Sequence, residues 1–206
     1  MEFLFNTFIV LLIVIDPLGN APIFMALTHN VTAAYRRQMA IRGIALATAI
    51  LLVFLLIGNT LLKALGIGIS AFRIAGGILL FLLAIDMVFA RQSGLRSTTV
   101  REQQEAELKQ DVSVFPLAFP LIAGPGALTT VLLMTSPQPA PWMFFGMLVA
   151  LLMVLGLALL SLLFADRIMR LLGETGANVI TRLLGLMLAT LATQYVLDGV
   201  QNAFFV

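Results

Sequence analysis

The 206-residue chain contains no cysteine and only one histidine, His29. Without cysteine it can form neither disulfide bonds nor thiolate metal sites, and it has no cysteine nucleophile. A single histidine also excludes a multi-histidine metal site within one chain. We therefore expect no metal centre, no catalytic residues and no cofactor.

Charged residues are also scarce, at 11% of the chain, whereas an average soluble domain contains about 25%. Hydrophobic residues make up 61%, and the mean hydropathy is +1.07. One globular core cannot bury this much apolar surface, so lipid must be the solvent for most of the chain. This composition excludes a soluble enzyme, a nucleic-acid-binding domain and a disordered protein. The pI near 9.5 reflects a net charge of only +2 and indicates no nucleic-acid partner.

Six long apolar stretches each reach the roughly 20 residues that a helix needs to cross a bilayer. They are continuous rather than alternating, which favours helices over strands. No Lys or Arg precedes the first stretch and no small-residue cleavage pattern closes it, so we expect it to remain in the membrane. The sequence thus predicts an all-α integral membrane protein with spans at residues 3–27, 40–62, 71–90, 113–134, 142–164 and 181–203.

The basic residues predict how these spans are oriented. Only Lys63 and Arg73 follow the second span, and the other ten basic residues follow spans one, three and five. Because basic loops stay in the cytoplasm, both termini are expected to be extracytoplasmic. The polar segment 91–112 is then a cytoplasmic linker between two units, residues 1–90 and 113–206. Its charged stretch, residues 100–109, is either a solvated tether or a short surface helix. The ten cytoplasmic residues are Arg36, Arg37, Arg42, Arg91, Arg96, Arg101, Lys109, Arg167, Arg170 and Arg182.

The two units show a weak internal repeat. A shift of 107 residues superimposes residues 15–66 on the second unit without a gap, and a shift of 109 continues the match. Three spans are an odd number, so the second unit must enter the membrane from the opposite side. Two inverted three-helix repeats of this kind recur in secondary transporters. The matched pairs are Ile15 with Ile122, Gly19 with Gly126, Asn59 with Asp166, Lys63 with Arg170, Leu65 with Leu172, Gly66 with Gly173, Arg73 with Arg182 and Gly76 with Gly185.

The first helix of each unit is interrupted by glycine and proline. Residues 16–22 read DPLGNAP, and residues 116–126 read PLAFPLIAGPG. Proline removes a backbone donor, and glycine permits non-helical dihedral angles. Asp16 lies about 13 residues into its span, or about 20 Å deep at 1.5 Å per residue. Unwound backbone at this depth must be buried in protein or line a wet cavity. The alternative is a pair of kinks that only bend helices 1 and 4 around their neighbours.

Two such breaks offer a binding chemistry for a small zwitterion. The half-helices that begin after Asn20 and Gly124 present unsatisfied N–H groups to a carboxylate, and carbonyls freed by the breaks accept from an ammonium group. The expected site lies near the bilayer midplane between spans one and four. Its expected substrate-binding residues are Asp16, Gly19, Asn20, Gly124, Gly126, Thr129 and Thr130.

Several of these polar residues have a second interpretation. Asp16 binds the ammonium group, carries a coupling proton or simply caps the following helix. Thr129 and Thr130 either donate to a carboxylate or hydrogen-bond within and between helices. Thr193 and Gln194 belong to a polar stripe on the last span, which either lines the translocation path or holds helices together.

Three stretches together resemble the MarC family of bacterial and archaeal inner-membrane proteins. They are residues 15–27 (IDPLGNAPIFMAL), 115–127 (FPLAFPLIAGPGA) and 192–199 (ATQYVLDG). The resemblance extends over essentially the whole chain, including the six spans and the linker. It implies a location in a prokaryotic inner (plasma) membrane and a similarity to transporters that carry glycine and alanine, coupled to an ion gradient. The family also resembles the LysE-type exporters, so the direction of transport stays open.

The sequence therefore predicts a secondary active transporter of small neutral amino acids, coupled to protons or sodium ions and working by alternating access. One alternative is an exporter of amino acids or other small metabolites, and another is a channel or passive pore. An embedded enzyme is not expected, because catalysis needs converging acid, base or metal groups. The expected partners are the amino acid, the lipid bilayer and, in a homo-oligomer, further copies of the chain.

Overall fold

A computed structural model describes residues 2–89, 111–135 and 140–204. Every regular element in this part of the chain is a helix, which confirms the prediction of an all-α protein. The helices are α1 (Glu2–Ile15), α2 (Pro17–Leu27), α3 (Ala33–Ala64), α4 (Ile69–Phe89), η1 (Ser113–Ile122), α6 (Pro125–Met134), α7 (Pro141–Leu163) and α8 (Ala165–Phe204). The predicted linker at residues 91–112, with its charged stretch 100–109, lies almost entirely outside the described residues.

The helices match the predicted spans closely. In the described residues, α3, α4, α7 and the 175–204 part of α8 are long and apolar enough to cross a membrane. Together α1 and α2 form a fifth candidate span, Glu2–Leu27, and the bent pair η1 and α6 provides a sixth. The second span was expected from residue 40, whereas α3 begins at Ala33 because the Thr32 hydroxyl caps it by accepting from the Tyr35 N–H at 3.4 Å. With 32 residues, α3 is about 48 Å long, which exceeds the roughly 30 Å hydrocarbon core.

The start of α8 differs from the prediction. A loop was expected before residue 181, but the chain is helical from Ala165 and is interrupted at Gly173, whose φ is 62°. Gly66, just after α3, has a φ of 68°. These left-handed conformations favour glycine because they are strained for other residues. The two glycines are 107 residues apart, so these matched positions of the sequence repeat both have a positive φ.

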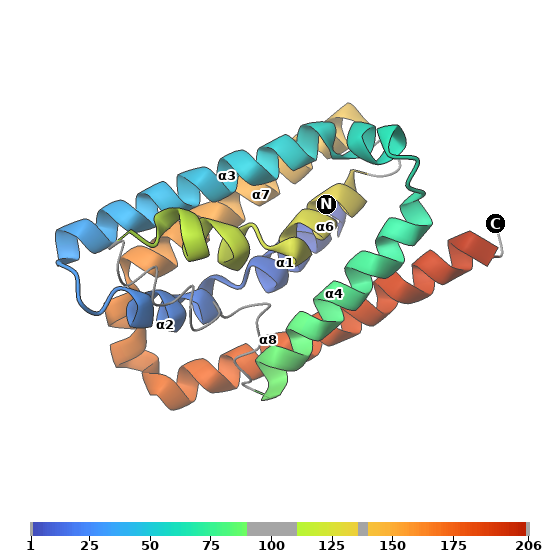
Figure 1. Ribbon diagram of the computed structural model, residues 1–206. Coiled ribbons are helices and arrows are strands. Elements are labelled where there is room, and N and C mark those ends of the chain that lie inside the picture. The colour runs from blue at the N-terminus through green and yellow to red at the C-terminus, as the bar shows by residue number, and fades with distance from the viewer. Residues whose placement is uncertain (1, 90–110, 136–139, 205–206) are drawn as a thin grey trace.

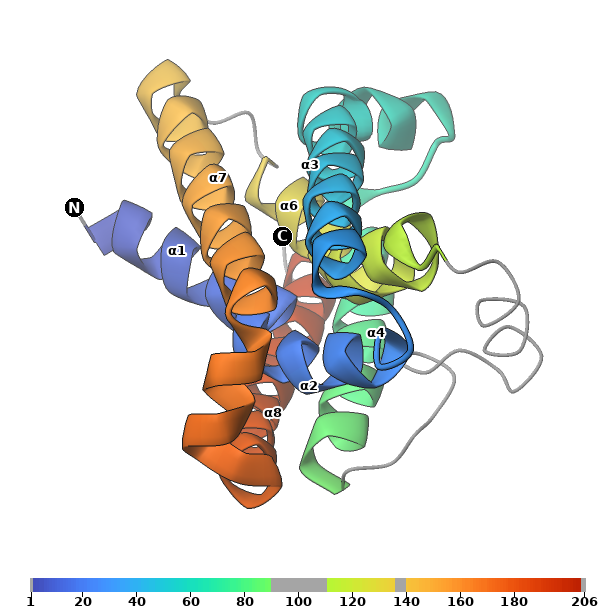
Figure 2. The same ribbon diagram turned by 90° about the vertical axis from the view of Figure 1, so that its left-hand side faces the viewer.

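The broken helices lie in the middle of the helix bundle. Figures 1 and 2 show α3 and α7 on one side, α4 and α8 paired on the other side, and α1, α2 and α6 between them. The residue that precedes each break, Ile15 or Ile122, is almost fully buried in the main hydrophobic core. The hydrophobic core therefore reaches both breaks, although Phe119 of the second break is 43% exposed.

The α4–α8 pair depends on glycine. A Cβ atom added to Gly77 would lie 2.8 Å from the carbonyl oxygen of Ala192, and one added to Gly199 would lie 3.0 Å from that of Ser70. Such close backbone approach is how small residues join helices in membranes, where there is no hydrophobic drive for association.

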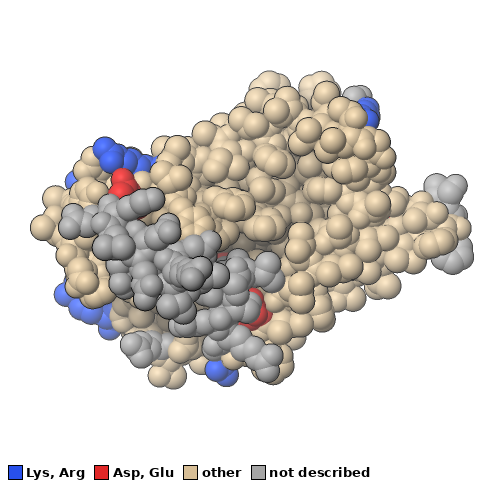
Figure 3. Space-filling model, in the orientation of Figure 1, with Lys and Arg blue, Asp and Glu red and all other residues tan. Residues whose placement is uncertain are grey.

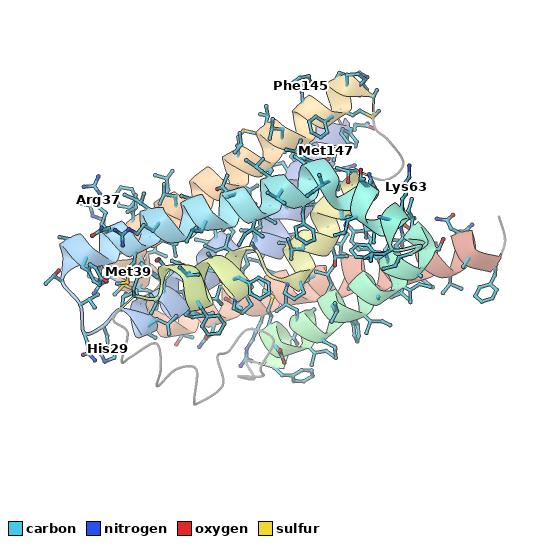
Figure 4. The ribbon with its side chains drawn as sticks, turned by 45° about the horizontal axis from the view of Figure 1, so that its top comes forward. His29, Arg37, Met39, Lys63, Phe145 and Met147 are labelled. Carbon is cyan, nitrogen blue, oxygen red and sulfur yellow. The ribbon has the colours of Figure 1, made fainter. Side chains whose placement is uncertain are left out.

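Charge divides the molecular surface into two unequal ends. Figure 3 shows basic side chains gathered at the end where α3 begins and a broad uncharged surface toward the opposite end. Figure 4 places His29 and Arg37 at the first of these ends and Lys63 at the other. The His29 ring is hydrogen-bonded through Nδ1 to the Ala26 carbonyl at 2.8 Å. The uncharged surface is the part of the molecule suited to contact with lipid.

Candidate functional site

At the first break, Asp16 connects two helices through a left-handed backbone conformation. Its φ and ψ are 49° and 66°, and it is fully buried. The side chain caps α2, with Oδ1 accepting from the Gly19 N–H at 3.0 Å, and Pro17 occupies the first helical position. A left-handed non-glycine residue costs about 1–3 kcal/mol, which the surrounding packing must offset. The capping role considered for Asp16 is thus seen directly in the structure.

The other residues of this motif have equally specific positions. A Cβ atom at Gly19 would collide with the Asp16 carboxylate, so the cap requires glycine there. Asn20 donates through Nδ2 to the Ile15 carbonyl at 2.7 Å, which satisfies a backbone acceptor that the break has freed. Asn20 is 1% exposed, and its Oδ1 has no hydrogen-bond partner among the described residues. The first break therefore presents one buried, unused acceptor.

The second break has a different construction. Phe115 and Phe119 have extended dihedral angles inside η1, each immediately before a proline with a cis peptide bond. Gly124 then precedes α6, and a Cβ atom there would collide with the Pro120 carbonyl oxygen. No side chain caps α6, in contrast to the Asp16 cap on α2. The first N–H groups of α6 thus form a partly positive helix end with no side-chain acceptor.

A small cavity lies where α1 and α4 adjoin the second break. It has a volume of about 20 Å³, enough for roughly one water molecule. Val14, two residues before Asp16, lines it together with Leu83 of α4 and the second break, which contributes Pro120, Leu121, Ile122, Gly124, Pro125, Gly126 and Ala127. The structure therefore brings the uncapped end of α6 next to the end of α1, although the two motifs are more than 100 residues apart in the chain.

The two threonines after the second break have different surroundings. Thr129 is buried and packs its methyl group against α4, where a Cβ atom at Gly76 would collide with it. Thr130 is fully buried, and its Oγ1 forms no well-aligned hydrogen bond with any of the described residues. The phenol of Tyr195 on α8 interacts with the Thr130 hydroxyl. Sequence reasoning missed Tyr195, although it is part of the ATQYVLDG motif.

The structure does not bring Thr193 and Gln194 to the breaks. Both are exposed on α8. The Thr193 hydroxyl donates to the Ala189 carbonyl at 2.9 Å, and Gln194 Nε2 donates to Asp198 Oδ1 at 2.7 Å. Their hydrogen bonds thus stay within their own helix.

Sequence reasoning also missed a clamp between the two halves of the chain. The Arg36 Nη1 atom contacts both carboxylate oxygens of Asp166 at 3.0 Å, and Nη2 donates to the Thr28 carbonyl at 3.2 Å. Arg36 therefore connects the end of α2 with the start of α8. A surface cavity of about 610 Å³ adjoins the clamp and is lined by Met25, Asp166, Met169, Arg170 and Gly173.

A related contact lies at the end of α6. Asn59 donates through Nδ2 to the Thr135 carbonyl at 2.6 Å. Thr28 and Thr135 are separated by 107 residues, as are Asn59 and Asp166, so these four residues occupy matched positions of the repeat, whereas Arg36 matches Met143. In each case a side chain of α3 binds the carbonyl that follows a broken helix. Asn59 binds that of Thr135, and Arg36, which also binds Asp166 of α8, binds that of Thr28.

A third polar contact anchors the start of the second half. Arg42 Nη1 lies 3.6 Å from Asp111 Oδ2, and Asp111 Oδ1 accepts from the Ser113 N–H at 3.0 Å. The Ser113 hydrogen bonds, helped by the Arg42 charge, hold the pKa of Asp111 below its ordinary value of 3.8. No group of three potential metal-binding His, Cys, Asp or Glu residues comes together in the described part of the chain.

Comparison with known proteins gives a consistent result over the full chain. The model of the MarC family integral membrane proteins matches residues 1–204. The chain is 37% identical to the membrane protein YvbG of Bacillus subtilis, with 98% of this chain and 96% of that protein covered. It is 36% identical to a membrane protein of Archaeoglobus fulgidus (97% and 92% covered) and 36% identical to the inner membrane protein YhgN of Escherichia coli (98% of both). No solved structure matches the chain.

Proposed function

The chain belongs to the MarC family of integral membrane proteins, and from this premise we propose that it is a secondary active transporter of small neutral amino acids such as glycine and alanine. Transport is coupled to a proton or sodium gradient. The substrate binds where the two broken helices meet, and the two halves of the chain move around it.

The contact of the second break with α1 and α4, the first of which leads into the first break, is the observation that supports this function most directly. The uncapped N-terminus of α6 offers free N–H groups and the positive end of a helix dipole to a carboxylate. At the first break, Asn20 Oδ1 is a buried acceptor without a partner among the described residues. Buried polar groups of this kind are costly unless a ligand completes their hydrogen bonds. A zwitterion offers a carboxylate to the α6 N-terminus and an ammonium group to the Asn20 acceptor.

The surroundings of the cavity favour a substrate with a small side chain. Val14, Leu83 and Ile122 cover it with apolar groups. A Cβ atom at Gly126 would already lie 2.6 Å from a methyl group of Leu80. Because the space is this limited, a bulky side chain would require the helices to separate. Glycine and alanine need the smallest displacement.

The matched contacts of the two halves support an inverted-repeat mechanism. In such transporters, an exchange of conformations between the halves converts one facing state into the other. Asp166 of the Arg36–Asp166 clamp and Asn59 of the Asn59–Thr135 hydrogen bond are matched positions of the repeat, and the two contacts lie at the ends of α2 and α6. We assign them the role of gates on the two sides of the membrane. The cavity between them has room for only about one water, which fits an occluded site.

The distribution of charge supports an orientation in the membrane. The end with Arg37 and His29 is rich in basic side chains, and the end with Lys63 is not (Figures 3 and 4). By the positive-inside rule the first end faces the cytoplasm, so both termini are extracytoplasmic. An inner-membrane location agrees with that of the similar Escherichia coli protein YhgN, which is named an inner membrane protein.

Counterflow in proteoliposomes tests the proposed transport. Preloaded unlabelled glycine accelerates the entry of labelled glycine through a carrier, because each carrier returns loaded and ready for exchange. A proton or sodium gradient applied separately then identifies the coupling ion. Flux that is linear in concentration, without acceleration, supports a passive pore and contradicts the proposal. Coupled flux that runs only outward supports the exporter alternative.

A pair of glycine variants links transport to the site. Gly126→Leu fills the space beside Leu80, whereas Gly156→Leu on α7 meets open space, because no atom lies within 4 Å of an added Cβ. We expect Gly126→Leu to abolish counterflow and Gly156→Leu to preserve it, with equal amounts of folded protein compared. Equal activity of the two variants would place the substrate elsewhere.

A further inference from the structure

One face of α8 carries a regular seam of exposed residues. The residue spacing along the seam alternates between four and three over nearly the whole span, which is the heptad pattern of helices that pair with another helix. Leu183, Met187 and Leu197 of the seam are 59%, 55% and 58% exposed. The α8 seam consists of Leu183, Met187, Thr190, Gln194, Leu197 and Gln201, all of which are exposed.

The α8 seam points away from the rest of the protein. The residues by which α8 packs on α4 include Gly185, Ala192 and Gly199, which approach Met87, Gly77 and Ile74. At about 100° per residue, the centre of this packed face and the centre of the seam are about 180° apart on the helix. The seam is thus directed outward, on the side of α8 opposite to α4.

Three members of the seam are polar, although they belong to a membrane span, residues 175–204. The Thr190 hydroxyl donates to the Leu186 carbonyl at 3.0 Å within the helix. Gln194 uses one amide hydrogen on Asp198. Its second amide hydrogen and its carbonyl oxygen have no hydrogen bond among the described residues. Lipid offers no partner for these groups, so polar side chains on a span usually face another helix or water.

We propose that the α8 seam is the contact surface for a second copy of this chain, with the two α8 helices parallel about a two-fold axis along the membrane normal. A parallel pair places each seam residue next to its own copy. A glutamine amide both donates and accepts, so Gln194 and Gln201 are self-complementary in this arrangement. Leu183, Met187 and Leu197 fill the layers between them. The seam carries no formal charge, so the two copies do not repel each other.

This dimer is independent of transport by the site between the breaks. That site lies on the packed side of the bundle, among α1, α4 and the second break, and it is complete within one copy. A dimer that does not transport glycine would support the seam and refute the proposed function. A monomer that transports glycine would support the proposed function and refute the seam.

The absence of cysteine makes cross-linking a direct test, because an introduced cysteine is the only thiol in the chain. Leu197→Cys places a thiol on the seam, and Met153→Cys, at a residue of α7 that is 51% exposed, places a thiol at a matched apolar position. We expect an oxidant to link Leu197→Cys copies into disulfide dimers in native membranes and to leave Met153→Cys monomeric. Equal cross-linking of both variants, or of neither, overturns the proposal.

A second measurement separates an interface from a water-filled path. In Gln194→Cys, a thiol inside a dimer interface is shielded from a water-soluble maleimide, whereas a thiol that lines an aqueous path is labelled rapidly. Rapid labelling overturns the proposal.

For the dimer itself, counting fluorophores per particle in dilute liposomes gives the monomer–dimer equilibrium. We expect Gln194→Leu with Gln201→Leu to weaken dimerisation by about tenfold through loss of the interhelical hydrogen bonds. An unchanged equilibrium contradicts the proposed role of the amides.

Discussion

Replacing Asn20 by leucine tests both roles assigned to the first break. The side chain changes little in size but loses its amide. The Nδ2 hydrogen bond to the Ile15 carbonyl, 2.7 Å long in the native protein, disappears. Asn20 is 1% exposed, so water cannot replace the lost donor without opening the core.

The expected cost follows from the acceptor left behind. A buried carbonyl without a partner costs about 1–3 kcal/mol, whereas the net value of an ordinary hydrogen bond is about 1 kcal/mol. We therefore expect the free energy of unfolding to fall by about 1–3 kcal/mol. The rate of glycine counterflow at equal folded protein should also fall, because the substrate loses its hydrogen bond to Asn20 Oδ1. A hydrogen bond to a charged ammonium group contributes about 1.5–3 kcal/mol, which corresponds to a roughly 10- to 150-fold loss of affinity.

Two assays on the same preparation separate the two effects. Denaturant titration in detergent micelles gives the change in unfolding free energy, and glycine counterflow at equal folded protein gives the change in transport. Asn30→Leu makes the same chemical change at an exposed position and serves as the control, expected within about 0.5 kcal/mol of the native protein. Native stability in Asn20→Leu would refute the structural role of the amide. Native transport would refute its role in binding.

Two further perturbations address the ends and the packing of the bundle. Asp166→Asn breaks the ion pair with Arg36 and is expected to speed maleimide labelling of a cysteine placed at Met25, at most about fivefold, because ion pairs this exposed contribute about 1 kcal/mol or less. An unchanged labelling rate would show that the clamp does not control access. Gly77→Leu forces a side chain against the backbone of α8 and is expected to destabilise the protein by about 1–3 kcal/mol, measured as a lower Tm in detergent. Gly156→Leu, which meets open space, should keep the native Tm, and equal Tm values for the two variants would contradict the close packing of α4 and α8.

Local sequence signals predict the spans and the breaks because both depend on neighbouring residues. A continuous apolar stretch must be helical in lipid to satisfy its own backbone. Pro17, Pro120 and Gly124 each remove a backbone donor or permit non-helical dihedral angles, which favours an interruption, although Pro22 lies inside α2 without ending it. Two errors, at Ala33 and Ala165, occur where helices continue beyond the hydrocarbon and where apolar periodicity carries no information. The half-helix expected after Asn20 was also wrong: α2 begins at Pro17, because Asp16 caps it and proline fits the first helical position.

The sequence by itself determined the solvent of this protein, the length and number of its spans and the places where two helices are interrupted, because each is a property of local composition and backbone chemistry. Only the tertiary structure decided which of these groups meet. It set Val14 against the uncapped end of α6, joined Arg36 to Asp166 across 130 residues of chain and turned Gln194 outward. Periodicity defines the faces of a helix, but packing against other helices decides which face is inside.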